Sequence, residues 1–149
     1  MEIRQASSND IPQLCVLLNS LFTQEAEFSP DTERQAVGLG AIIEGDGIGD
    51  ILVAVEAGEI IGMVNLLYTI STALGSRVAI LEDMIIAPAY RGLGMGSLLL
   101  EQAIDFAKNK GCKRITLLTD SDNERAQQFY QKHGFELSSM NAYRLFFDS

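Results

Sequence analysis

The sequence predicts one α/β (α+β) domain over residues 1–149, with four helices and a central mixed, mostly antiparallel sheet of six to seven strands. Three observations support this prediction. Strand and helix periodicities follow one another in the order β-α-α-β-β-β-α-β-α-β-β. Three successive strands between residues 51 and 86 are joined by short turns, which is typical of an antiparallel meander. A strand, a helix and a strand over 79–119 then predict a parallel crossover.

The first third of the chain is expected to form one strand and two helices. The strand covers residues 3–6, and Ser7 or Ser8 caps a helix with an apolar stripe. A second helix is expected to begin at Ser29 and Pro30, since serine suits the cap and proline the first turn. This helix should run to about Glu44.

The remaining elements are separated by glycine-containing turns. The predicted strands cover 51–56, 60–70 and 77–86, with turns at Ala57-Gly58 and at 74–76. A helix over 98–110 ends at Gly111, and a second helix begins at Asn123 or Asp122 and ends before Gly134. Further strands are expected over 113–119, 135–137 and 143–147.

Composition and charge exclude several classes of protein. The chain is 47% hydrophobic and has a net charge of −9, which argues against disorder and against nucleic-acid binding. Its apolar runs are too short to span a membrane. Cys15 and Cys112 lack metal-site spacing, so we expect free thiols, no metal and a cytoplasmic location.

The charge is unevenly distributed along the chain. Residues 1–79 contain three Lys or Arg and eleven Asp or Glu, whereas residues 80–149 contain eight and nine. The acidic half could attract a cationic amine, and a solvated surface that favours solubility is an equally good interpretation.

A basic, glycine-rich turn lies between a predicted strand and a predicted helix. Its residues are Arg91, Gly92, Leu93, Gly94, Met95, Gly96 and Ser97. Small residues let the backbone approach an anion, and the first N–H groups of a helix point toward it. The turn lacks the Gly-Lys-Ser/Thr of a Walker A loop, and Ser97 replaces the third glycine of a dinucleotide fingerprint. A phosphorylated ligand is therefore expected, and a nucleotide-binding protein is a weaker alternative.

The pattern Arg-x-x-Gly-x-Gly, with Pro88 upstream, resembles motif A of the GNAT superfamily of acyl-CoA-dependent N-acetyltransferases. Two further features match the family: the Glu82-Asp83 pair, and the segment Asn-x-x-Ala-x-x-Phe-Tyr-x-x-x-Gly-Phe over 123–135. The resemblance is firm from 78 to 135. It implies a GNAT fold in which two parallel strands splay apart to admit acetyl-CoA.

The resemblance also implies a role for each matching residue. Backbone groups of Met84, Ile85 and Ile86 would bind the pantetheine arm like an added strand, although an ordinary core strand has the same sequence pattern. The turn from Arg91 to Ser97 would bind the pyrophosphate. Asn123 would contact the pantetheine arm, and it could also cap a helix.

Glu82 and Tyr130 are the candidate catalytic residues. Strand alternation would place Glu82 on the same face as Met84 and Ile86, with Asp83 on the other. In the related polyamine acetyltransferases, a glutamate in a matching Leu-Glu-Asp run is implicated in deprotonating the amine. Tyr130 would protonate the departing thiolate. The alternatives are a structural carboxylate for Glu82 and a core aromatic for Tyr130.

The resemblance implies an N-acetyltransferase that moves an acetyl group from acetyl-CoA to a primary amine of a small acceptor through a ternary complex. The alternative is a non-catalytic acyl-CoA-binding or sensor module on the same fold. Neither nucleic acid nor a membrane is an expected partner. Family members often form homodimers, and the apolar residues Leu145, Phe146 and Phe147 would allow one here.

Overall fold

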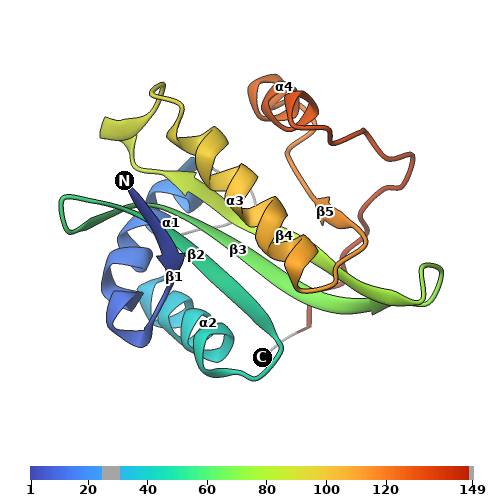
Figure 1. Cartoon of the computed structure of the whole chain (residues 1–149), viewed down its shortest axis with the longest axis horizontal. Helices are drawn as coiled ribbons and strands as arrows, with labels where there is room; N and C mark the ends of the chain where they lie inside the picture. The colour runs from blue at the N-terminus through green and yellow to red at the C-terminus, as the bar shows by residue number, and fades with distance from the viewer. Residues whose placement is uncertain (25–30, 148–149) are drawn as a thin grey trace. The chain divides into compact units, whose positions relative to one another are not determined.

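The computed structural model describes residues 1–24 and 31–147, which belong to two compact units, Met1–Leu117 and Leu118–Ser149. The first unit contains a five-stranded sheet, three α-helices and two short 3-10 helices, and the second contains one α-helix (Figure 1). The elements are β1 (Glu2–Gln5), η1 (Ser8–Asp10), α1 (Ile11–Gln24), α2 (Thr32–Glu44), β2 (Gly49–Glu56), β3 (Glu59–Ser71), β4 (Ser76–Ile86), η2 (Pro88–Tyr90), α3 (Met95–Asn109), β5 (Ile115–Leu117) and α4 (Glu124–Lys132).

The strands of the first unit lie side by side in their order along the chain, from β1 to β5. The pairs β1–β2, β2–β3 and β3–β4 are antiparallel, and β4–β5 is parallel. The predicted meander and the parallel crossover through α3 are both confirmed. A parallel pair needs such a crossover because its connection must return to the same end of the sheet.

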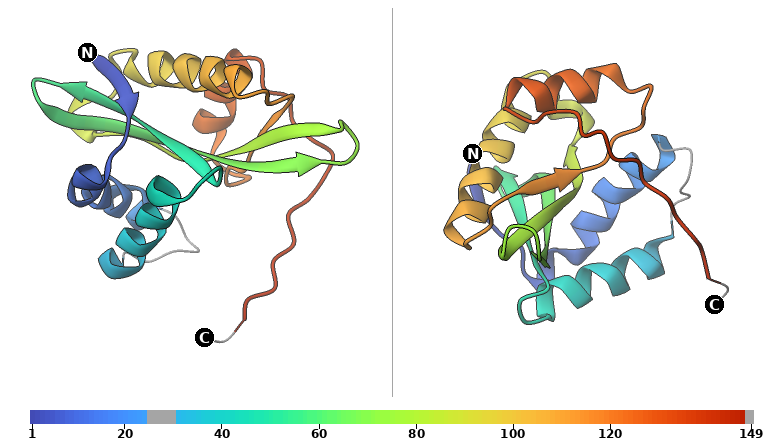
Figure 2. Two further views of the ribbon diagram at one scale, coloured as in Figure 1. Left: turned by 60° about the horizontal axis from the view of Figure 1, so that its bottom comes forward. Right: turned by 90° about the vertical axis from the view of Figure 1, so that its right-hand side faces the viewer.

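Helices cover both faces of this sheet. Helices α1 and α2 lie on one face and α3 lies on the other (Figure 2). The face under α1 and α2 buries a core cluster, which includes Leu14, Leu18, Leu39, Met63 and Ile85. Helix α3 buries Leu99, Leu100, Ala103 and Ala107. Burial on both faces explains why β3 is an almost continuous apolar run.

The expected number of strands was wrong, because the sheet has five strands and not six to seven. The segments 135–137 and 143–147 form no strand, and the large apolar side chains there, Leu137, Tyr143, Leu145, Phe146 and Phe147, are exposed. Apolar and aromatic residues favour strands only when a neighbouring strand supplies hydrogen bonds and packing. The strand predicted over 113–119 is also shorter, at Ile115–Leu117.

The start of α2 also differs from the prediction. Ser29 and Pro30, where the sequence suggested the start, lie outside the described residues. The N-cap is Asp31, whose carboxylate accepts a hydrogen bond from the backbone N–H of Arg34 at 3.1 Å. An aspartate cap satisfies one of the helix's first free N–H groups as a serine would.

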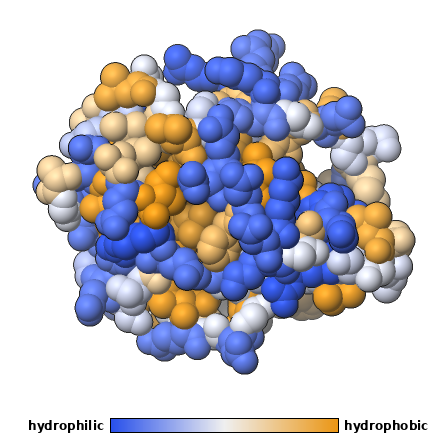
Figure 3. Space-filling model, viewed as in Figure 1, coloured by the Kyte–Doolittle hydropathy of each residue, from blue (hydrophilic) through white to orange (hydrophobic). Residues whose placement is uncertain are grey.

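Hydrophilic side chains cover most of the face drawn in Figure 3, with apolar residues in separate patches between them. None of the helices in the described part of the chain is long and apolar enough to cross a membrane.

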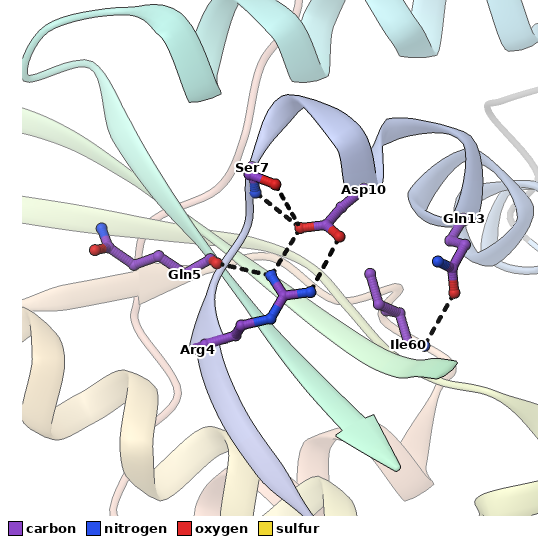
Figure 4. A network of polar contacts seen from close by, with 6 residues as sticks. All are labelled: Arg4, Gln5, Ser7, Asp10, Gln13 and Ile60. Atoms are coloured by element: carbon purple, nitrogen blue, oxygen red, sulfur yellow. Dashed lines mark hydrogen bonds and ion pairs between the residues drawn. The ribbon is translucent and has the colours of Figure 1, made fainter. Parts of the chain in front are cut away.

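A half-buried ion pair joins β1 to η1 (Figure 4). The guanidinium of Arg4 donates to both carboxylate oxygens of Asp10, at 2.8 and 3.1 Å. The backbone N–H of Ser7 donates to Asp10 at 2.8 Å, which completes a capping box at η1. The hydrogen bond from Arg4 is the main reason why the pKa of Asp10 lies below its usual value.

We predict that Asp10→Asn destabilises the protein by about 2 kcal/mol at pH 7, because it removes charged hydrogen bonds at a buried site. The pKa of Asp10 is lower in the folded state than in the unfolded state, where it is about 3.9. The ionised carboxylate therefore stabilises the fold fully above a pH of about 3.9, and this stabilisation is lost as the pH falls through the folded pKa. Urea unfolding should therefore show a larger difference from wild type at pH 7 than at pH 3. Asp46→Asn, in an exposed loop, is the control. An equal loss at both pH values would contradict the ion-pair explanation.

The turn between β2 and β3 carries a strained residue. Ala57 has φ +50° and Gly58 has φ +79°, so both central positions of this two-residue turn are left-handed. Glycine accepts this conformation readily, whereas alanine pays a steric cost of about 1 kcal/mol.

We predict that Ala57→Asn raises the free energy of unfolding by about 0.5 kcal/mol or more, because asparagine tolerates the left-handed region. Thermal or urea unfolding measures the change. Ala73→Asn, at an exposed turn position without a positive φ, is the matched control and should show no gain. A gain of equal size in the control would mean that strain at Ala57 is not the cause.

Candidate active site

Strand β4 is paired on one edge along most of its length but on the other for only three residues. Its parallel pairing with β5 covers Ala79, Ile80 and Leu81. Within the described residues, 82–86 therefore have no strand partner on that edge. Unpaired backbone groups at a strand edge are available to an extended ligand that carries amides.

A glycine turn follows β4 and the short helix η2, and it leads directly into α3. Gly92 has φ +77° and Gly94 has φ +81°, so the backbone there adopts the left-handed conformation that glycine favours. A Cβ built at either glycine meets nothing within 4 Å. The glycines are therefore required by the shape of the backbone and not by crowding.

Helix α3 begins with an uncapped N-terminus. Gly94 is its N-cap residue, and no side chain in the described part of the chain caps it. The N–H groups of Gly94, Met95 and Gly96 thus have no acceptor inside the helix. Such a terminus carries a partial positive charge, which suits a phosphate.

Arg91 lies at the entrance of this turn and is exposed. Its Nε donates to the backbone carbonyl of Ile86 at 2.9 Å. This hydrogen bond holds the side chain against the end of β4 and uses the Ile86 carbonyl. Leu93 is also exposed, and Ser97 lies in the first turn of α3.

A β-bulge interrupts β4 at the two acidic residues. Glu82 pairs with Asn65, but the next pair in the register joins Ile85 to Met63, so β4 has one extra residue. Asp83 has φ +53°, the left-handed conformation typical of the first residue of one class of bulge. The extra residue shifts the faces of all side chains that follow it.

The bulge overturns the expected arrangement of the acidic side chains. Met63 and Asn65 share a face of β3, so Glu82 shares a face with Ile85 and not with Ile86. Asp83 also reaches this face, because the Asn65 amide Nδ2 donates to its Oδ2 at 3.4 Å. The prediction that strand alternation separates Asp83 from Glu82 was wrong.

The environments of the two carboxylates differ. Glu82 is exposed, whereas Asp83 is half-buried. Burial raises the pKa of Asp83 to about 6, the negative charge of Glu82 raises it as well, and the hydrogen bond from Asn65 opposes this. A carboxyl with a pKa near neutrality is a better proton acceptor than an ordinary one.

Asn65 was not identified from the sequence. It is 2% exposed, and its Oδ1 is buried without a hydrogen-bond partner among the described residues. A polar residue inside the apolar run of β3 was the available signal, because buried amides need partners.

The second unit holds the other two predicted site residues. Asn123 is the N-cap of α4, and its side-chain oxygen accepts from the N–H of Ala126 at 3.1 Å. The expected capping role is therefore confirmed. Tyr130 packs edge to face against Phe129 and Phe135, with ring centroids 5.2 and 5.6 Å away. Burial raises the pKa of Tyr130 to about 12, so its phenol stays protonated at neutral pH.

Cys15 and Cys112 are free thiols, and burial raises the pKa of each. A raised pKa disfavours the thiolate that a nucleophile needs. No group of three or more His, Cys, Asp or Glu residues that could hold a metal ion occurs in the part of the chain that the structure describes.

Comparison with known proteins identifies relatives of this chain. The family model described as "Acetyltransferase (GNAT) family" matches residues 12–135. An uncharacterised N-acetyltransferase of Bacillus subtilis, YhfO, is 35% identical over 139 residues, which cover 91% of this chain and 90% of YhfO. The glucosamine 6-phosphate N-acetyltransferase of Trypanosoma brucei brucei is 33% identical over 79 residues, which cover 52% of each chain.

A solved structure from Agrobacterium tumefaciens, assigned as an acetyltransferase, superposes with a TM-score of 0.82 and 25% identity, and the match covers 97% of this chain and 99% of that one. The family match, the relatives and the fold agree with the geometry of β4 and its glycine turn. The chain belongs to the GNAT family of acetyltransferases.

Proposed function

We propose that this protein transfers an acetyl group from acetyl-CoA to a primary amine of a small acceptor, by direct transfer within a ternary complex. GNAT acetyltransferases in general use acetyl-CoA, which makes it the expected donor. The observation that carries the proposal is the unpaired edge of β4 over 82–86, which leads through a glycine turn to the uncapped start of α3.

The pyrophosphate of the donor would lie at the start of α3. The residues from Arg91 to Ser97 supply a guanidinium and backbone N–H donors in one short turn. Charge-assisted hydrogen bonds of this kind are about twice as strong as neutral ones. The left-handed conformations of Gly92 and Gly94 support this assignment, because they give the turn a shape that residues with a side chain rarely adopt.

The pantetheine arm would add to β4 along its unpaired edge. Backbone groups of Met84 and Ile85 are the proposed contacts, and Ile86 would contribute its N–H, since its carbonyl accepts from Arg91. Asn123 is proposed to contact the arm through its amide nitrogen, because the side-chain oxygen caps α4. A backbone N–H of β4 would also polarise the thioester carbonyl.

Acetyl transfer requires one group that removes a proton from the amine and one that returns a proton to the thiolate. Glu82 is the base that the sequence suggests, and its exposure on the bulge makes it accessible to an acceptor. Tyr130 is the proposed acid, and its raised pKa supports this role because it keeps the proton in place until a strongly basic thiolate forms.

The acceptor is proposed to be a small cationic amine. The two carboxylates at the bulge and the acidic first half of the chain favour a positively charged ligand. The trypanosomal relative acts, by its name, on glucosamine 6-phosphate, which places amino sugars beside polyamines and amino acids among the acceptors to test.

We predict amine-dependent release of free CoA thiol from acetyl-CoA with at least one member of a panel of polyamines, amino acids, aminoglycosides, amino sugars and short peptides. Tyr130→Phe should lower kcat by about tenfold or more, since it removes the proton donor without removing the ring. Phe129→Tyr is a control that adds a hydroxyl at the neighbouring position. Full activity of Tyr130→Phe would exclude the acid role, and no release with any amine would contradict the proposed reaction.

We predict that Gly94→Ala weakens acetyl-CoA binding by about tenfold, since a left-handed alanine costs about 1 kcal/mol or more and the turn must change shape to avoid it. Isothermal titration calorimetry measures the affinity. Gly38→Ala, inside α2 and with open space around the added Cβ, is the matched control. It should bind acetyl-CoA normally and unfold at a higher temperature, because alanine favours a helix over glycine. Unchanged binding in Gly94→Ala would remove the turn from the donor site.

A further inference from the structure

At the bulge, Asp83 combines an unusual backbone conformation with a hydrogen bond from the buried amide of Asn65. A residue with φ +53° in the middle of a strand is strained, and its side chain is drawn into the sheet by a hydrogen bond from a neighbouring strand. Asn65 is almost completely buried, whereas Asp83 keeps partial exposure. The carboxyl can therefore meet a ligand on one side while the amide holds it on the other.

Only one of the two polar atoms of the Asn65 side-chain amide has a hydrogen-bond partner among the described residues. Its Nδ2 donates to Asp83, but its Oδ1 has no partner among the described residues. An unsatisfied buried acceptor costs free energy, so its presence needs an explanation. A protonated Asp83 would have an O–H to donate, and an Asn65 amide turned by 180° would place Oδ1 where Nδ2 now lies. The pair has a hydrogen bond available whether Asp83 carries a proton or not.

We propose that Asp83 accepts the proton of the acceptor's ammonium group, that Asn65 positions Asp83 in both protonation states, and that Glu82 attracts the ammonium by its charge. This inference rests on the proposed function and reassigns, within it, the proton acceptor from Glu82 to Asp83.

The charges around Asp83 agree with this role. On β4 the charged neighbour is Glu82, and β3 supplies the uncharged Asn65. Helix α1, which also packs against β4, contains no Asp, Glu, Lys, Arg or His. The acidic and basic residues of α3, Glu101, Asp105 and Lys108, are exposed on the helix that covers the other face. The cations of these elements are Arg77, which lies over the Tyr68 ring near the start of β4, and Lys108 of α3. Neither of them perturbs the pKa of Asp83, on which the charge of Glu82 acts.

The proton balance of the step is complete. Asp83 takes one proton from the ammonium, and the amine lone pair then attacks the acyl carbon of the thioester. The C–N bond forms and the C–S bond breaks, and the thiolate receives a proton from the general acid. The second proton leaves the nitrogen through solvent and restores the general acid. Asp83 returns its proton to solvent after the products leave. A pKa of about 6 keeps Asp83 mostly ionised at pH 7 and makes it a stronger base than an ordinary aspartate.

The test compares Asp83→Asn with Glu82→Gln, two changes that each remove one negative charge and keep the shape of the side chain. Asparagine tolerates a left-handed conformation at least as well as aspartate, so Asp83→Asn should keep the bulge. Asp105→Asn, on the exposed side of α3, controls for net charge. Thermal unfolding and acetyl-CoA affinity, measured for every variant, report whether the fold and the donor site are intact.

We expect Asp83→Asn to turn over at least about 100-fold more slowly than wild type, with unchanged acetyl-CoA affinity. Glu82→Gln should mainly raise KM for cationic amines, and Asp105→Asn should match wild type. The acidic limb of the pH profile of kcat should be absent in Asp83→Asn. Activity of Asp83→Asn within threefold of wild type, or a slower turnover in Glu82→Gln than in Asp83→Asn, would overturn the proposal.

Asn65→Ala tests the positioning role separately. Removal of the hydrogen bond that opposes the rise in pKa should move the acidic limb of the profile to higher pH, whereas a merely structural residue would lower the rate without moving the limb. An unmoved limb would overturn the role of Asn65.

Carbon-13 NMR titration of the Asp83 carboxyl, with and without spermidine, needs no turnover. A transition near pH 6 that spermidine shifts downward supports the inference, and a transition below pH 4.5 overturns it. This experiment also separates the two proposals. If wild type turned over no amine, this would count against the proposed function. The titration would still decide whether the pKa of the Asp83 carboxyl is raised and whether this carboxyl binds an ammonium group.

Discussion

The short pairing between β4 and β5 is the constraint on which the rest of the site depends. After three residue pairs the two parallel strands stop bonding, although β4 continues for five more residues. Backbone N–H and C=O groups must find partners when they are removed from water, so an unpaired edge inside a domain is a place for a ligand. The chain then leaves β4 through the glycine turn, and one unpaired edge is therefore continuous with one uncapped helix terminus.

Local signals in the sequence predicted several turns and helix ends in both units. The turn at Ala57 and Gly58, the end of α3 near Gly111 and the cap at Asn123 each depend on a few neighbouring residues, and each appears in the structure. The last two strands were expected to close the sheet, over segments that contain apolar and aromatic residues. Such residues fit a strand only when another strand lies beside them, which is not a local property. Leu137 and Tyr143 are instead 90% and 93% exposed.

The bulge was invisible in the sequence for a different reason. Strand alternation assumes a regular register, and a left-handed position is usually marked by glycine. Here the position is occupied by Asp83, one of the few other residues that tolerate the conformation. A single extra residue then brings Glu82 and Asp83 to the same face, so the pairing of the acidic side chains follows from backbone geometry and not from their spacing.

The bulge also explains how one strand could serve two ligands of opposite charge. The start of α3 favours an anion, whereas a cationic amine requires carboxylates, and such groups on one surface would partly cancel each other. Strand β4 separates them along its length, since Glu82 and Asp83 lie at the bulge and the glycine turn follows its end. The bulge turns the carboxylates toward the face of α1 and α2, while α3 covers the opposite face. The sheet itself thus keeps the negative and the positive regions on different faces, and an acyl group held at the edge of β4 would lie between the two.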